Sequence, residues 1–419
     1  MTEQLLQFIW QFRYFNMAEL TTTAGEPLEI IHPGKHNTNQ GPDFLNAKIK
    51  CGDTLLAGNI EVHVQASEWS AHRHSEDKNY NNVILHVVLQ EDQQLNLPFP
   101  VLELGGRISK LLSEKYETLL QAQRFIPCEA YADKINDLTL LSWKERLLTE
   151  RLQEKAASVQ KILEKNNYHW EETFWQVLAK NFGASINSDA FECIAASLPL
   201  TLLAKHRSRL HQLEALLMGQ AGLLDEKFRD DYPIMLQKEY RFLKKKYTLR
   251  SPAIALHFLR MRPANFPTVR LAQLAMLIHE SSALFSFMIN AKALEDVMKK
   301  FEVTANDYWH YRYCFDEPSA YRKKTLGAQM IRSIMMNTVL PVMYTYGWYH
   351  NSEGYKAGAL NWAAALPPEN NKITGGFEKL GMANRSAADS QALIQLKNKY
   401  CNEKRCLECA IGNQILKAP

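Results

Sequence analysis

Three side chains near the N-terminus have the types and spacing of a divalent-cation site. Asp43 follows a proline, and Glu61 comes 18 residues later in the tripeptide Glu-Val-His. Carboxylates are the natural ligands of the hard cations that assist phosphodiester hydrolysis. His63 lies two residues after Glu61 and therefore on the same face of a strand. We expect Asp43 and Glu61 to hold the metal (Mg²⁺ or Mn²⁺) and His63 to place or deprotonate a water molecule.

More histidines surround this pattern. An imidazole is a metal ligand that favours Mn²⁺, Fe²⁺ or Zn²⁺ over Mg²⁺, but a single histidine is more often a hydrogen-bonded core or surface residue. His86 sits in the apolar run Val-Ile-Leu-His-Val-Val, so its ring needs a polar partner, for which Glu61 or Asp77 is suitable. The possible accessory residues are His72, His74, Asp77, Tyr80 and His86, whereas Trp69 is expected to pack in the core.

The elements around these residues predict an α+β protein. A helix is expected at 3–18, followed by strands at 28–31, 44–50 and 55–64, a polar helix-containing connection at 67–80 and a buried strand at 83–89. The turn Cys51-Gly52-Asp53 brings the second and third strands together, so that the two acids become neighbours. From residue 108 onward the pattern is helical. Helices are expected at 141–164, 170–182, 187–196, 200–219, 252–261, 268–301, 326–345 and 390–400, and residues 347–385 read as loop.

The order of these elements and acids resembles the PD-(D/E)xK nuclease superfamily. Pro42-Asp43 matches the first half of that motif and Glu61 the second, while His63 stands where the family usually has lysine. The resemblance implies a small mixed sheet of the restriction-endonuclease type and a nucleic-acid substrate. It divides the chain into a nuclease-like α/β domain (1–105), a linker helix (106–134) and a larger helical domain (135–419).

The whole chain also resembles an uncharacterised bacterial family that is known only as a domain of unknown function. The segments that carry this resemblance are GPDFLNA at 41–47, GNIEVHV at 58–64, NNVILHVV at 81–88, RPANFPTVRLAQLA at 262–275 and RCLECAIGNQIL at 405–416. This resemblance implies a shared architecture, and it supplies no activity.

Two further groups point to ligands. Cys401, Cys406 and Cys409 can converge on zinc or an iron–sulfur cluster with Cys128 as a fourth ligand, although reduced structural thiols explain the same pattern. Some helicase-linked nucleases of the superfamily use a similar staple of one distant and three clustered cysteines. A basic run suits phosphate contacts, although a solvated helix face is the simpler explanation; its candidate residues are Lys244, Lys245, Lys246 and Arg262.

Composition sets broad limits on function. With 49 basic and 45 acidic residues, the net charge of +4 does not by itself identify a nucleic-acid partner. The N-terminus does not read as a signal peptide and no long apolar run predicts a membrane span, so seven cysteines favour a cytoplasmic protein. We expect a metal-dependent nuclease acting on DNA or RNA. The alternatives are a catalytically inactive nucleic-acid or protein-binding adaptor and a metal-dependent hydrolase of another substrate.

Overall fold

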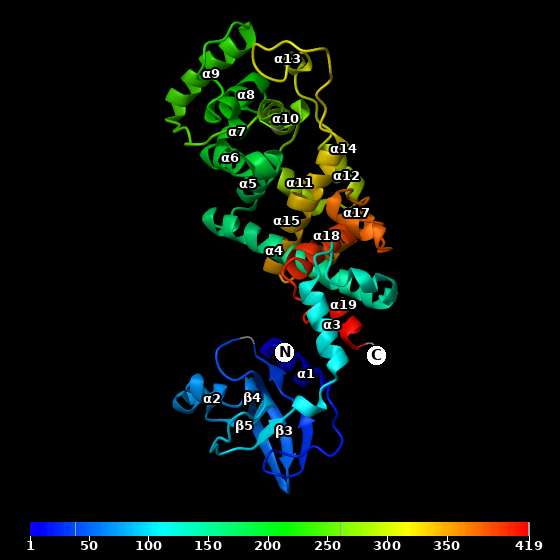
Figure 1. Ribbon diagram of the computed structural model, residues 1–419. Helices are drawn as coiled ribbons and strands as arrows, with labels where there is room; N and C mark the ends of the chain where they lie inside the picture. The colour runs from blue at the N-terminus through cyan, green and yellow to red at the C-terminus, as the bar shows by residue number, and fades with distance from the viewer. Residues whose placement is uncertain (38, 260, 418–419) are drawn as a thin grey trace. The chain divides into compact units, whose positions relative to one another are not determined.

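The computed structural model describes residues 1–37, 39–259 and 261–417, and the described chain forms two compact units (Figure 1). Unit 1 comprises residues 1–143, 379–381 and the described residues from Leu396 onward, and unit 2 comprises residues 144–378 and 382–395. Unit 1 contains a mixed sheet with flanking helices and unit 2 is helical, so the predicted α+β class is confirmed. Unit 1 includes the cysteine segment that the sequence assigned to the helical domain. The domain boundaries at residues 105 and 134 stay predictions.

The sheet of unit 1 has six strands in the order β1-β3-β4-β5-β6, with β2 paired to β3. Neighbours are antiparallel up to β4, and β4, β5 and β6 run parallel. β5 is buried over six consecutive residues, as expected for a parallel strand inside a sheet. The strands are β1 (Leu28–His32), β2 (Lys35–His36), β3 (Phe44–Cys51), β4 (Thr54–Gln65), β5 (Val83–Gln90) and β6 (Val101–Glu103).

Short helices and the two ends of the chain complete unit 1. Helix α1 (Glu3–Phe12) begins after Thr2, whose hydroxyl accepts from the Leu5 amide. The connection between β4 and β5 contains α2 (Glu68–Ala71) and the 3₁₀ turns η1 (His74–Glu76) and η2 (Lys78–Tyr80). The remaining elements are η3 (Gly105–Arg107), α3 (Lys110–Gln121), η4 (Glu129–Lys134), the π-helix η7 (Leu396–Cys401) and α19 (Ala410–Lys417).

Unit 2 is built from helices, beginning within α4 (Asp137–Lys165). The others are α5 (Trp170–Phe182), α6 (Ala184–Ser197), α7 (Leu200–His206), α8 (Leu210–Gln220), α9 (Asp231–Tyr247), η5 (Pro263–Asn265), α10 (Pro267–Glu280), α11 (Leu284–Asn290), α12 (Leu294–Lys300), α13 (Asp307–His310), α14 (Ala328–Ile334), the π-helix η6 (Met335–Val339), α15 (Leu340–Tyr349), α16 (Glu353–Ala365), α17 (Lys372–Lys379) and α18 (Ala387–Gln395). No single described helix is long and apolar enough to cross a membrane; α10 and α11 pass that test only as a pair, and the pair bends by 72°.

Two sequence predictions in unit 2 are wrong. Residues 252–259 form no helix. Within them, the Asn187 side chain bonds both backbone groups of His257, which are therefore not available to a helix. Residue 260 of that prediction lies outside the described residues. The segment 347–385 contains α16 and α17 instead of loop. The alanines of α16 favour a helix, and its Gly358 packs so closely that a Cβ there would lie 2.5 Å from Met343 Cε.

Candidate metal centre

A β-bulge places the two predicted acids on one face of the sheet. Ala47 pairs with Gly58, but Phe44 pairs with Ile60, so β3 has one more residue than β4 between these two pairs. If the pairing continued from Ala47 without the bulge, Asp43 would lie opposite Val62. The Asp43 side chain would then point to the face of the sheet opposite to that of Glu61. Asn46, at the bulge, adopts a left-handed conformation (φ +58°), which asparagine tolerates better than most residues.

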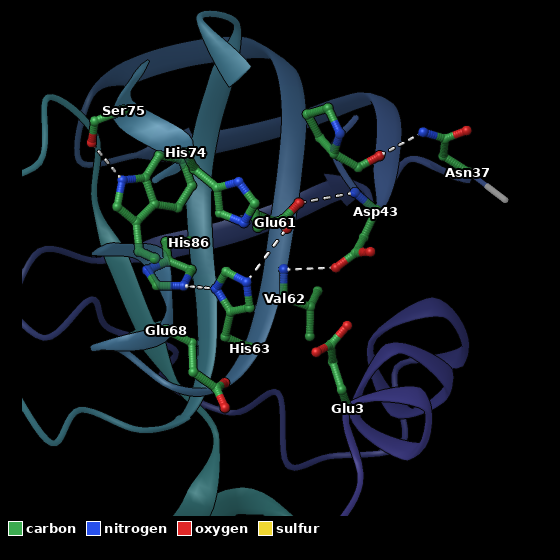
Figure 2. Close-up of polar contacts among 12 residues, drawn as sticks. Glu3, Asn37, Asp43, Glu61, Val62, His63, Glu68, His74, Ser75 and His86 are labelled. Atoms are coloured by element: carbon green, nitrogen blue, oxygen red, sulfur yellow. Dashed lines mark hydrogen bonds and ion pairs between the residues drawn. The ribbon is translucent and has the colours of Figure 1, made fainter. Parts of the chain in front are cut away.

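Asp43 and Glu61 are held side by side by reciprocal hydrogen bonds. The Asp43 amide donates to Glu61 Oε2 at 3.1 Å, and the Val62 amide donates to Asp43 Oδ2 at the same distance (Figure 2). These bonds use one oxygen of each carboxylate. The second oxygen of Asp43 accepts from Gln7 Nε2 at 2.9 Å, and the second oxygen of Glu61 faces histidine rings.

Helix α1 adds a third carboxylate that the sequence did not reveal. Gln7 Nε2 bonds both Asp43 Oδ1 and, at 3.1 Å, Glu3 Oε1, and Figure 2 shows Glu3 beside Asp43. In the described part of the chain, no lysine or arginine forms a salt bridge with any of these three acids. The apolar pattern around α1 predicts a buried helix and gives no sign of this role, because only the tertiary packing brings residue 3 near residue 43.

Four histidines gather beside Glu61. His63, on β4, and His86, which is in register with Glu61 on β5, point from the same face of the sheet. His72 and His74 come from the connection above that face, and their rings lie 5.1 and 5.3 Å from the ring of His63. His63, His72 and His74 each offer a nitrogen, and the three nitrogens lie within 4.8 Å of one another. This spacing allows one metal ion to be bound by all three.

The two nitrogens of His63 have different neighbours. His63 Nδ1 lies 2.9 Å from His86 Nε2, whereas His63 Nε2 lies 3.5 Å from Glu61 Oε1 (Figure 2). If His63 Nδ1–H donates to His86, the lone pair of His63 Nε2 is available to a metal, the arrangement usual for histidine ligands. The expectation that Glu61 or Asp77 would satisfy His86 is wrong, since His63 is its partner. His86 Nδ1 has no hydrogen-bond partner among the described residues.

Burial shifts the pKa values of the acids and the imidazoles in opposite directions. Desolvation is the largest cause of the raised pKa of Asp43 and of Glu61, and the charge of Asp43 raises that of Glu61 further. Desolvation, followed by the neighbouring imidazoles, lowers the pKa of His63 to about 3, and it lowers that of His86 to about 4. A histidine with so low a pKa is a weak base at neutral pH, so His63 suits a ligand better than the base that the sequence suggested.

The accessory residues predicted from the sequence make different kinds of contact. Tyr80 stacks on His74 with ring centres 3.9 Å apart, and burial raises the pKa of Tyr80 to about 12. Asp77 accepts from the Asn79 amide at the start of η2, which is a structural role. Trp69 is buried against His74 and His86 and donates to Ser75 Oγ, so the expectation that it packs is confirmed.

The cysteines of the C-terminal segment lie in the same unit as Cys128, the distant cysteine predicted to join them. Cys128, Cys401, Cys406 and Cys409 are all buried, free and part of unit 1. Burial is the largest cause of the raised pKa of each thiol; other thiols of the group raise those of Cys128, Cys401 and Cys406 further. The amides of Ile411 and Gly412, at the start of α19, bond Cys409 and work against this rise. Among the described residues, the group of three ligand atoms within 4.8 Å is that of the histidines, not of these thiols.

The predicted basic run lies at the end of α9. Lys244 donates to Ser251 Oγ and Lys246 lies over the ring of Tyr247, while Lys245 is exposed. Arg262 is exposed immediately before η5. None of these residues lines a described cavity of unit 2.

One family model matches residues 3–372, and its description is "Protein of unknown function (DUF2851)". No curated protein and no solved structure matches the chain.

Proposed function

The chain belongs to the DUF2851 family of proteins of unknown function, and we propose from its geometry that unit 1 is a metal-dependent phosphodiesterase of the nuclease type. The observation that carries this proposal is the convergence of three histidine nitrogens within 4.8 Å of one another beside Glu61, which itself is bound to Asp43. The resemblance to PD-(D/E)xK nucleases, with Asp43 immediately before β3 and Glu61 on the adjacent strand β4, supports the choice of phosphodiesters.

The residues present fit a transition-metal ion better than Mg²⁺. The donor set is imidazole-rich, and imidazole suits Zn²⁺, Mn²⁺ or Fe²⁺. The low pKa of His63 keeps its ring neutral, as a ligand must be. Three carboxylates without a lysine or arginine partner among the described residues also favour a cation.

Some residues of unit 1 would bind such an ion and others would position those ligands. His63, His72 and His74 would hold it, with Glu61 Oε1 beside them, and His86 would fix the tautomer of His63. Asp43 positions Glu61 through the reciprocal bonds, and Gln7 holds Asp43. The ion, when bound, supplies Lewis acidity toward a phosphoryl oxygen and lowers the pKa of water.

The adaptor alternative is favoured by one specific observation. Glu61 is 5% exposed and His63 is 1% exposed, and each acid accepts a backbone hydrogen bond, Asp43 from the Val62 amide of β4 and Glu61 from the Asp43 amide. A purely structural acid pair would look the same. In that case unit 1 keeps the fold and binds a nucleic acid or a protein, but it does not cleave a phosphodiester.

The test begins with metal binding. Full-length protein, stripped with a chelator, is titrated with Zn²⁺ and Mn²⁺ by calorimetry. The exposed residue His72 is changed in His72→Ala, and His350→Ala removes an exposed histidine of unit 2 as the matched control. We expect the first change to weaken metal binding at least tenfold and the control to leave it unchanged. Equal binding by all three proteins, or none by any, refutes the metal centre.

Cleavage is then measured separately. The same proteins and Glu61→Gln are incubated with bis(p-nitrophenyl) phosphate, single-stranded DNA and RNA, with each metal in turn. The proposal predicts turnover that falls at least tenfold in His72→Ala and Glu61→Gln and not in His350→Ala. Tight metal binding without cleavage of any of these substrates supports the adaptor instead.

The cysteine group remains a second candidate metal site, for zinc or an iron–sulfur cluster. Its four thiols are gathered in one unit, but they need to approach one another further to bind a single ion. Elemental analysis of the purified protein, compared with that of Cys128→Ser, tests it directly. One equivalent of zinc or several of iron that disappear in the variant support the site.

A further inference from the structure

Two neighbouring cavities of unit 2 are lined by positive charge. One has a volume of about 690 Å³ and is lined by residues of α4, α5, α6 and the α14–η6 segment. The other, of about 380 Å³, is lined by residues of α10, of α14 and of the chain before α14. They share Ala184, Met330 and Ser333, so they adjoin. We call the two together the basic groove. Its cationic residues are Lys155, Lys161, Lys165, Lys180, Arg270, Arg322, Lys323 and Lys324, and its acidic residue is Glu192.

Buried cations in the groove have neutral acceptors where carboxylates would be expected. Arg270 is 8% exposed, and its guanidinium donates to Gln273 Oε1 at 2.9 Å and Asn265 Oδ1 at 2.6 Å. Lys324 is 4% exposed; its ammonium donates to two backbone oxygens, of Arg322 at 3.2 Å and of His310 at 3.5 Å, and lies 3.7 Å from the ring centre of Tyr313. No acidic side chain of the described chain forms a salt bridge with either residue.

Lys155 shows the same pattern in the larger cavity. Its ammonium donates to Met336 O, Asn337 Oδ1 and Gln391 Oε1, all at 2.9–3.0 Å. The π-helix η6 supplies two of these acceptors, and π-helical turns are frequent at functional sites. Burial, followed by the charge of Arg151, lowers the pKa of Lys155 to about 7, against a smaller opposing effect of Glu369, and burial alone lowers the pKa of Arg270 to about 10. A buried charge without a counter-charge is expensive, so Arg270 and Lys324, which form no salt bridge with a described acidic residue, leave the groove short of an anion.

The rim of the groove carries further unpaired cations. Lys161 and Lys165 are exposed on successive turns of α4, about 6 Å apart along the helix axis. Arg322 and Lys323 are exposed at the second cavity. None of these four forms a salt bridge with a described acidic residue. Glu192 does not cancel this charge, because it is already paired with Lys180 at 2.6 Å.

We propose that the basic groove binds the sugar–phosphate backbone of a nucleic acid strand. The wall also offers hydroxyl and amide groups, which with lysine and arginine are the usual phosphate contacts; among them are Ser158, Ser185, Ser333, Asn181 and Gln329. No aromatic side chain lines either described cavity, so there is no platform for the base of a mononucleotide. A chain of phosphates therefore fits better than a single nucleotide, and binding is independent of sequence.

This inference goes beyond the proposed function, because it concerns unit 2 and needs no metal. Binding is measured by fluorescence anisotropy with full-length protein, fluorescein-labelled 20-mers of DNA and RNA, and EDTA present throughout. The test variants change only rim residues, Lys161→Gln/Lys165→Gln and Arg322→Gln/Lys323→Gln. The matched control removes two exposed cations that line neither cavity in Lys205→Gln/Arg209→Gln, and Lys244→Gln/Lys245→Gln tests the α9 run as a rival site. Circular dichroism confirms that each protein is folded.

We expect micromolar binding that each rim double variant weakens at least tenfold, with the control within twofold of the parent. The slope of log affinity against log salt concentration should become shallower by about 0.7 for each lysine that contacted a phosphate of a single strand. Loss of binding in the α9 variant but not in the rim variants would place the contact on α9 and overturn the inference. So would the absence of binding to any 20-mer, or binding of inorganic tripolyphosphate alone.

Discussion

Replacing Asn46 tests whether the bulge in β3 creates the candidate metal centre. The Asn46 side chain is exposed and its backbone is left-handed at φ +58°, so a substitution there changes backbone preference with little loss of packing. Asn46→Val places a β-branched residue where it is least tolerated, whereas Asn46→Gly keeps the conformation accessible. The two variants therefore separate the conformation of the bulge from the chemistry of the side chain.

The size of the effect follows from the conformational preference. A left-handed residue other than glycine costs roughly 1–2 kcal/mol, which corresponds to a factor of about 5–30 in an equilibrium constant. In Asn46→Val, this conformational cost destabilises the bulge relative to a regular register, in which Asp43 would lie opposite Val62. The hydrogen bond from the Val62 amide to Asp43 Oδ2 would then be lost.

Hydrogen exchange followed by mass spectrometry reports on that bond directly. We expect the Val62 amide to exchange about 5–30 times faster in Asn46→Val and at nearly the parental rate in Asn46→Gly. Peptides from unit 2 serve as the internal reference and should not change. Equal protection of Val62 in all three proteins, or equal loss in both variants, would show that the bulge does not hold the acid pair.

Three further predictions concern stability. Burial raises the pKa of Glu214 from 4.5 to about 7, so between these pH values the folded protein binds a proton that the unfolded chain does not. The free energy of unfolding therefore falls as pH rises from about 4.5 to 7, by ~3 kcal/mol at most, and Glu214→Gln should flatten this part of a denaturation–pH profile. Gly58→Ala should destabilise unit 1 by about 1–3 kcal/mol in denaturant titrations, since its Cβ would lie 2.5 Å from the Asn82 carbonyl oxygen. Gly219→Ala should lower the melting temperature of unit 2, because its Cβ would lie 2.2 Å from the Tyr240 ring, whereas Gly375→Ala, where a Cβ meets nothing within 4 Å, should not.

Local patterns predicted the sheet of unit 1 well. The alternation in 44–50 and the continuous apolar run at 83–89 correspond to β3 and β5, because burial on one face or on both leaves a direct mark on the sequence. The helices of unit 2 were harder to delimit. The segment 268–301 has one helical pattern but contains three helices, α10, α11 and α12. The bend between α10 and α11 depends on packing that a periodic pattern does not record.

The site shows the same limit. Spacing along two strands was enough to expect Asp43 and Glu61 together, and the bonds between them exist. Glu3 and the His63–His86 pair were missed as neighbours, since they depend on the docking of α1 and on the parallel register of β4 and β5. The bulge at Asn46 left only a weak signal, an asparagine in a strand.

The candidate metal centre of unit 1 lacks positive charge, and the basic groove of unit 2 lacks negative charge. In unit 1, Glu3, Asp43 and Glu61 lie near the neutral imidazole of His63 and no described lysine or arginine forms a salt bridge with them, which favours a cation as the missing component. In unit 2, Arg270 and Lys324 are buried with neutral acceptors, so the missing component is an anion. A nucleic acid with its divalent metal supplies both charges. A neutral or cationic small-molecule substrate does not supply the anion that unit 2 lacks. This complementarity, which depends on the charges of each unit and not on their arrangement, is the physical reason to test phosphodiester polymers before other substrates.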